Sequence, residues 1–274
     1  MLRKKAICLL SALVFGVTPL AAVNIKNNDT KIVKKNKYFF EVGRATLEDI
    51  VKKEPKIRPY KDYIKESIEK YKTIYDVAPS IIVAILKFET SNFNRYAISP
   101  AGAAGIAQFI PETAIEKFKL KAYYPSYLKD ARNYKRLAIR EEAKAIYYLK
   151  KLDTKEALKH MKLSILYNKK SKSLFSKYKK DLISLIKNKD GSYKSDEELS
   201  KIDERFLPEK AIDAMVHYVA ELLKARNGDI REAVSAYNAG LHAVEIYGGI
   251  PPYDQTVKYQ NKIMNKIKEY EGFK

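Results

Sequence analysis

Residues 79–89 read PSIIVAILKFE, and this stretch decides the fold. Pro79 suits a first helical turn, because the N–H that it lacks would have no partner inside the helix. Between Ile81 and Phe88 only Lys87 is not apolar, so a helix here is apolar on all sides and belongs in a core. The stretch therefore predicts a buried helix that ends in a carboxylate, Glu89.

The flanking sequence continues in helices. Ile64, Ile68, Tyr71 and Tyr75 recur at steps of four and three residues, which marks one buried helical face. Residues 95–111 contain two prolines and two glycines and are typical of a loop. Further helical patterns lie in 113–118, 138–149, 154–167, 174–187, 209–225, 230–239 and 256–270. No alternating pattern typical of strands is evident, so we expect an all-α fold.

The composition excludes several classes of protein. The chain has 274 residues, of which 46% are hydrophobic, enough for a globular protein. The single cysteine, Cys8, excludes a disulfide scaffold and a thiolate metal site. His160, His217 and His242 are scattered, without the spacing of a zinc site. We therefore expect neither a metal nor an organic cofactor.

The N-terminus has the order of a secretory signal. Residues 3–5 are basic, residues 6–17 are apolar, and small residues lie near position 22. We expect residues 1–22 to be a cleaved signal and the protein to be exported to the periplasm or cell envelope; the alternative is a membrane anchor that stays attached. Residues 23–60 are polar and lysine-rich and are interpreted as a linker.

Positive charge is concentrated in one part of the chain. The formal net charge is +20, and residues 117–200 contain 23 Lys or Arg against 10 Asp or Glu. This is either a solvated helical surface or a surface that attracts an anionic cell-wall polymer or a membrane. A nucleic-acid partner has only the charge in its favour, and the export signal argues against it.

Short motifs follow Glu89 in a fixed order. They are ETSNFN (89–94), SPAGAAGIAQ (99–108), PETA (111–114), AYNAG (236–240), YGGIP (247–251) and TVKY (256–259). This set resembles the catalytic domain of soluble-type lytic transglycosylases, lysozyme-like enzymes that cut bacterial peptidoglycan. The resemblance covers residues 61–116 and 201–270. It implies a lysozyme-like domain, related to goose-type lysozymes, with residues 117–200 as a basic helical insertion.

The resemblance also assigns site residues. Glu89 occupies the position of the family's single acid/base glutamate, and Ser99 that of the serine that supports it. Gln108 stands where the family has a sugar-contacting glutamine, after Ile106 and Ala107 in place of Leu and Met. A loop-capping role for the Gln108 amide is the structural alternative.

Three more residues follow from the later motifs. Tyr237 and Asn238 match the family's Ala-Tyr-Asn-Ala-Gly motif, whose tyrosine lies beside the acid. Tyr259 corresponds to a tyrosine near the end of the domain. For Tyr237 the alternative is a core aromatic without a role in binding.

The carboxylates of this region favour transfer over hydrolysis. At the end of an apolar helix, Glu89 is expected to be desolvated, which raises its pKa above about 4.3 and suits a general acid. Its alternative is a glutamate that reaches solvent. Glycosidases pair two carboxylates, but residues 90–111 contain none, although Glu112, Glu204 or Glu209 could fold nearby. The related goose-type lysozymes carry supporting aspartates in this region.

These observations predict an exported peptidoglycan lytic transglycosylase that acts on glycan strands as a monomer. It would cleave the β-1,4 bond between MurNAc and GlcNAc and form 1,6-anhydroMurNAc, with Glu89 as acid and base. Two alternatives stay open: a non-catalytic, peptidoglycan-binding lysozyme-like module of an envelope assembly, and a hydrolytic muramidase.

Overall fold

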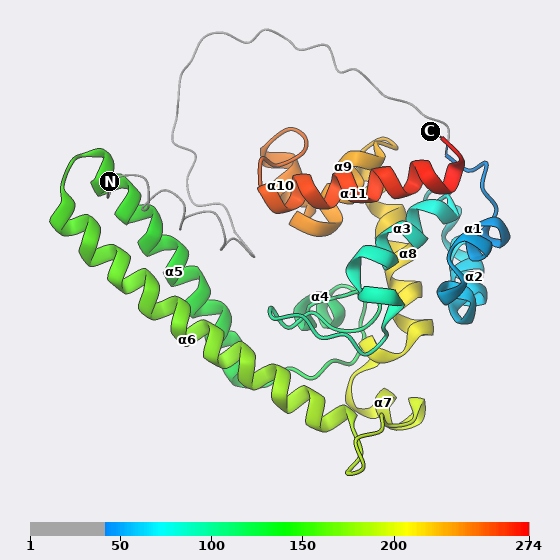
Figure 1. Cartoon of the computed structure of the whole chain (residues 1–274), viewed down its shortest axis with the longest axis horizontal. Coiled ribbons are helices and arrows are strands. Elements are labelled where there is room, and N and C mark those ends of the chain that lie inside the picture. The colour runs from blue at the N-terminus through cyan, green and yellow to red at the C-terminus, as the bar shows by residue number, and fades with distance from the viewer. Residues whose placement is uncertain (1–41, 274) are drawn as a thin grey trace, which may run out of the picture. The chain divides into compact units, whose positions relative to one another are not determined.

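The computed structural model describes residues 42–273, and these form an all-α structure (Figure 1). Apart from three isolated β-bridges, every regular element in this range is a helix. The described chain divides into two compact units. The larger contains 42–99, 103–123 and 185–273, and the smaller contains 100–102 and 124–184. The all-α prediction is confirmed. None of the helices within 42–273 is both long and apolar enough to cross a membrane.

The larger unit holds the hydrophobic core and most of the short helices. In chain order these are α1 (Leu47–Lys53), η1 (Pro55–Tyr60), α2 (Lys61–Tyr71), α3 (Pro79–Glu89), η2 (Ser91–Phe93), α4 (Pro111–Glu116), α7 (Asp196–Ile202), η3 (Glu204–Phe206), α8 (Pro208–Ala225), α9 (Ile230–Ala239), α10 (Leu241–Ile246) and α11 (Asp254–Glu271). Helix α8 packs against α2 and α9, and α11 packs against α3 and α9.

Helix α3 lies at the centre of this core. Pro79 stands in its first turn, and all residues from Ile81 to Leu86 are at most 2% exposed. Full burial of one such aliphatic side chain contributes about 1.5–3 kcal/mol, so this helix anchors the unit. It ends after Glu89, because Thr90 adopts an extended conformation. The prediction of a buried helix that ends at Glu89 is therefore confirmed.

Part of the predicted linker is folded. Residues 23–41 lie outside the described residues, but α1 begins after a Thr46 cap and buries Leu47, Ile50 and Val51. The prediction of a linker up to residue 60 is thus wrong for its last part. The spacing of these three residues is helical, but the lysine-rich composition around them obscured it.

The folded N-terminal segment is tied to the far end of the chain. The buried carboxylate of Glu271, at the end of α11, accepts hydrogen bonds from the backbone N–H groups of Gly43 (3.1 Å), Arg44 (2.9 Å) and Ala45 (3.0 Å). It also accepts one from the Ser80 hydroxyl at the start of α3. This carboxylate joins the two ends of the described chain to the central helix.

The smaller unit is a helical hairpin of α5 (Ser126–Lys150) and most of α6 (Thr154–Ile186). The two helices run antiparallel side by side (Figure 1). Two contacts between them follow this direction: Ser171 Oγ donates to Ala131 O (2.9 Å), and the earlier residue His160 pairs through Nδ1 with Oε2 of the later residue Glu141 (2.5 Å). The separate helices expected at 154–167 and 174–187 are one continuous helix, since no Pro or Gly interrupts the sequence between them.

Candidate active site

The carboxyl group of Glu89 lies at the C-terminal end of α3, where the core meets the loop that follows. The side chain is half-buried, next to aliphatic residues of the same helix that are fully buried. Burial raises its pKa to about 7, because the charged carboxylate loses hydration that the neutral acid does not need. At neutral pH a substantial fraction of Glu89 is therefore protonated.

Tyr259, from α11, is the hydrogen-bond partner of Glu89. Its hydroxyl donates to Oε1 of Glu89, and this bond lowers the Glu89 pKa, partly opposing the effect of burial. The pKa of Tyr259 itself is raised well above its ordinary value by burial and by the nearby Glu89 charge. Tyr259 thus stays a neutral phenol that can donate a hydrogen bond throughout the physiological pH range.

Tyr237, from α9, lies close to the same carboxyl group. Burial, followed by the charge of Glu89, raises the pKa of Tyr237 well above its ordinary value. Its hydroxyl donates to Ala107 O at 2.8 Å and so joins α9 to the loop before α4. The next residue, Asn238, accepts a hydrogen bond from Thr256 Oγ1 (3.0 Å), which links the end of α9 to the start of α11.

Gln108 belongs to the loop that Tyr237 contacts. Its φ of +51° is left-handed, a conformation that non-glycine residues seldom adopt. The side-chain amide nitrogen donates to Ala97 O (3.1 Å) and to Gly105 O (2.8 Å), so both of its N–H groups hold the loop together. The Gln108 amide thus has the loop-capping role that was the structural alternative. Only the amide oxygen is left over from these two bonds for another partner.

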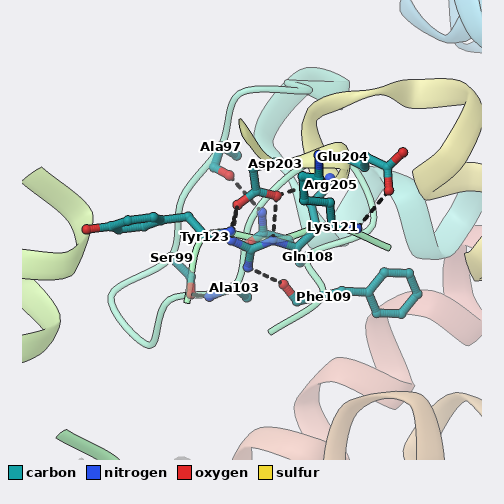
Figure 2. A network of polar contacts seen from close by, with 10 residues as sticks. All are labelled: Ala97, Ser99, Ala103, Gln108, Phe109, Lys121, Tyr123, Asp203, Glu204 and Arg205. Atoms are coloured by element: carbon teal, nitrogen blue, oxygen red, sulfur yellow. Dashed lines mark hydrogen bonds and ion pairs between the residues drawn. The ribbon is translucent and has the colours of Figure 1, made fainter. Parts of the chain in front are cut away.

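A buried ion pair between Arg205 and Asp203 contacts the backbone of this loop at Phe109 (Figure 2). The Arg205 side chain is fully buried, and its guanidinium donates to both oxygens of Asp203 (2.9 and 2.6 Å) and to Phe109 O (3.0 Å). Asp203 in turn accepts from the backbone N–H of Tyr123 at 3.1 Å. Such a two-pronged pair, with further hydrogen bonds, compensates for the cost of burying both charges. The ion pair thus binds Phe109 and Tyr123, which lie on either side of α4 in the sequence.

The loop also approaches η3 through its backbone. Gly105 has a φ of +79°, and a Cβ placed there would lie 1.7 Å from Arg205 O, so only glycine fits. Ser99 and Ala103 close the preceding turn: Ser99 N donates to Ala103 O (2.8 Å), and Ala103 N donates to Ser99 Oγ (3.0 Å).

The structure brings together three of the predicted site residues, Glu89, Tyr237 and Tyr259. Gln108 follows Ala107, the backbone contact of Tyr237, while Asn238 and Ser99 make bonds that hold the surrounding segments. Sequence reasoning missed Arg205 and its partner, since no pattern distinguishes a buried Arg from an exposed one in a lysine-rich chain.

The arrangement provides a carboxyl group, that of Glu89, which can act as a proton donor and acceptor. The Glu89 pKa shift has two causes, burial and Tyr259, and neither is a second carboxylate. Of the other acids considered, Glu204 is bound to the backbone N–H of Lys121 (2.7 Å; Figure 2). Within residues 42–273, no group of three or more His, Cys, Asp or Glu side chains is placed to hold a metal ion.

Comparison with known proteins identifies the family. The model of the transglycosylase SLT domain family matches residues 66–151 and 167–250, more than half of the chain. The match contains Glu89 and Tyr237, whereas Tyr259 lies beyond it. It also runs through much of the range 117–200, so the predicted insertion stays a prediction. No solved structure matches the chain. The chain belongs to the transglycosylase SLT domain family.

Proposed function

We propose that this protein is an exported lytic transglycosylase that cleaves the β-1,4 bond between MurNAc and GlcNAc in peptidoglycan. Membership of the family implies lytic transglycosylase activity on peptidoglycan. One observation carries the assignment to a residue: the desolvated carboxyl group of Glu89, with a pKa of about 7, in contact with Tyr259. The substrate, the product and the steps below are parts of the proposal.

In the first step the protonated Glu89 acts as the general acid. It transfers its proton to the oxygen that bridges the two sugars, and the bond from that oxygen to C1 of MurNAc breaks. The GlcNAc side leaves with a free hydroxyl, and positive charge develops at C1. A group whose pKa lies near the working pH is well suited to this transfer, which contributes about 10²- to 10⁴-fold in rate.

In the second step the same group acts as the base. Glu89, now a carboxylate, takes the proton of the MurNAc 6-hydroxyl while the 6-oxygen forms a bond to C1. The product is 1,6-anhydroMurNAc, Glu89 is again protonated, and no water is consumed. Because the nucleophile belongs to the substrate, its effective concentration is high and a second protein carboxylate is not needed. Tyr259, which donates to Oε1, stabilises the carboxylate between the two steps.

The neighbouring residues are proposed to orient the glycan strand. Tyr237 holds the backbone of Ala107, the residue before Gln108, and this supports a role for Gln108 in the site. The Gln108 amide nitrogen is committed to the loop, so any contact of this side chain with sugar uses its oxygen and a hydroxyl or acetamido N–H donor. Support for export comes from residues 1–22, which lie outside the described residues and carry the order of a signal peptide.

Clearing of a suspension of purified cell walls tests the proposal. The wild-type protein should lower the turbidity, and Glu89→Gln should slow clearing at least about 10²-fold, because the amide cannot transfer a proton. Glu116→Gln is the matched control: this glutamate is exposed at the end of α4 and should be replaceable without loss. Equal clearing by Glu89→Gln, or binding without clearing by the wild type, would show the proposal to be wrong.

A further inference from the structure

The turn of the α5–α6 hairpin exposes large apolar side chains. Leu152 is 86% exposed and has a φ of +62°, so it lies in the turn itself rather than in either helix. Tyr147 and Leu149 precede it on α5 and are 51% and 48% exposed, and Leu158 follows on α6 at 56%. We call these four residues the hairpin tip. Single exposed apolar residues are common on proteins, whereas here four lie close together in the sequence around one turn.

The residues of the hairpin tip are not among the buried residues that pack between the two helices. The seam between them consists of buried residues, mostly small, that recur every seven positions, which is the repeat of two helices packed along their length. They are Ala131, Ala138 and Ala145 on α5, and Ala157, Ser164, Ser171 and Tyr178 on α6. Tyr147, Leu149 and Leu158 lie outside this repeat, and Leu152, at its next step, lies beyond the end of α5 and is 86% exposed. Packing between the two helices therefore does not explain why these four residues are apolar.

The apolar surface continues along α6 among lysines. Leu158, Ile165 and Leu166 share one helical face, and the latter two are 62% and 45% exposed. Lys155 and Lys162 are exposed on the same face. Residues 144–170 contain eight lysines but only two acids, one of which, Glu156, pairs with Lys159 at 3.0 Å. The surface thus combines exposed leucines with a large excess of positive charge.

We propose that the hairpin tip docks on the surface of a lipid bilayer that contains anionic headgroups. Leucine side chains enter the boundary between headgroups and acyl chains, while tyrosine places its ring there with its hydroxyl in water. Lysine lays its methylene stem along apolar surface and directs its ammonium group to the lipid phosphates. The hairpin tip and its lysines provide all three kinds of contact.

The charge and the leucines together favour a membrane over other partners. An anionic wall polymer would match the lysines but leave Leu152 and Leu158 in water. An uncharged apolar groove on a protein would cover the leucines but leave the lysines without counter-charge. An anionic bilayer matches both. The inference does not depend on the proposed catalytic role of Glu89, since the hairpin tip would dock whether or not Glu89 acts as the acid.

Co-sedimentation with vesicles tests the docking. The chain from residue 23 onward contains every described residue and lacks the apolar segment 6–17, which would itself bind lipid. It should bind vesicles of equal parts phosphatidylglycerol and phosphatidylcholine and bind pure phosphatidylcholine much more weakly. The triple variant Leu149→Ser, Leu152→Ser, Leu158→Ser should weaken binding at least about tenfold. Leu185→Ser, on the same α6 helix and 37% exposed, is the control and should bind as the wild type does.

A second measurement reports insertion directly. The chain contains no tryptophan, so Leu152→Trp adds a single fluorescent probe at the turn. Its emission should shift to shorter wavelength with the anionic vesicles and be quenched by lipids brominated on the acyl chain. Leu185→Trp should show neither effect. The pair Lys155→Gln, Lys162→Gln should lower binding several-fold, and this difference should shrink at high salt.

The inference would be overturned by equal binding of the triple serine variant and the wild type, by unchanged Leu152→Trp emission with anionic vesicles, or by self-association through the hairpin tip in the absence of lipid. Binding to purified cell walls that is lost in the triple variant while vesicle binding is kept would also contradict it.

Discussion

Tyr259 donates a hydrogen bond to Glu89, a residue 170 positions earlier in the chain. The bond exists because α11 packs against α3, and it places a neutral phenol on the carboxyl group of Glu89. Burial raises the pKa of Glu89 and the phenol lowers it, so the balance between the two sets the protonation of the proposed acid.

The activity of the wild-type protein should decline as the pH rises above about 7. The first proposed step needs a protonated Glu89, and the protonated fraction falls tenfold per pH unit above the pKa of about 7. The measurement is kcat/KM on a soluble glycan fragment as a function of pH. A rate that stays constant up to about pH 9 would exclude Glu89 as the proton donor.

Glu89 should lower the stability of the fold at alkaline pH. Its folded-state pKa of about 7 exceeds the ordinary value of 4.5, so the folded state binds this proton more tightly than the unfolded state does. Stability is therefore lost as the pH rises from about 4.5 to 7. By linkage, Glu89→Gln should be more stable than the wild type by roughly 3 kcal/mol at about pH 8 and nearly equal to it near pH 4.5.

Denaturant unfolding of both proteins at the two pH values measures this difference. Equal stability of Glu89→Gln and the wild type at the alkaline pH would mean that burial does not perturb the carboxyl group.

Removal of the Tyr259 hydroxyl should shift the pH profile. Tyr259→Phe takes away the bond that lowers the Glu89 pKa, so the alkaline decline of kcat/KM should move to higher pH. Its kcat should also fall about tenfold, because the carboxylate between the two steps loses its donor. Tyr63→Phe, on the exposed side of α2, is the control and should leave the profile as it is. A profile that does not move in Tyr259→Phe would contradict the role of this bond.

The loop that carries Gln108 should not tolerate a methyl group at Gly105. In Gly105→Ala the new Cβ would meet Arg205 O at 1.7 Å, so the backbone must move away from η3. Gly191 offers a matched control, because its φ of +86° is similar to the +79° of Gly105 but nothing lies within 4 Å of a Cβ there. Gly191→Ala should lose about 1 kcal/mol of stability and Gly105→Ala at least about 3 kcal/mol.

Activity separates the two glycine variants as well. Gly105→Ala should also lose most wall-clearing activity, since Ala107 and Gln108 belong to the displaced loop, whereas Gly191→Ala should keep it. Equal effects of the two substitutions on stability would show that the close approach to η3 is unimportant.

The sequence predicted those parts of the structure that depend on local pattern. The apolar run from Ile81 to Leu86 defines the core helix and places Glu89 at its end. That position alone does not select Glu89 as an acid; its prediction as the acid came from the motifs that follow it. Proline and glycine spacing likewise predicted the loop of residues 95–111. In each case neighbours in the sequence determine the outcome.

Features that depend on distant contacts were not predictable in this way. The pairing of Arg205 with Asp203 at the loop, and the capture of residues 43–45 by Glu271, join parts of the chain that share no pattern. In the sequence, Arg205, Asp203 and Glu271 look like ordinary surface charges, because the chain has 53 basic and 33 acidic residues. Only the packing of the core turns them into buried charges with partners.

Mass spectrometry of the soluble products, released from purified cell walls in isotopically labelled water, tests the central claim most directly. If Glu89 alone serves as acid and then as base, the muramic acid ends are 1,6-anhydro, one water lighter than reducing ends, and carry no label. Muramic acid ends that are reducing and contain one labelled oxygen would show that water is the nucleophile and would contradict this mechanism.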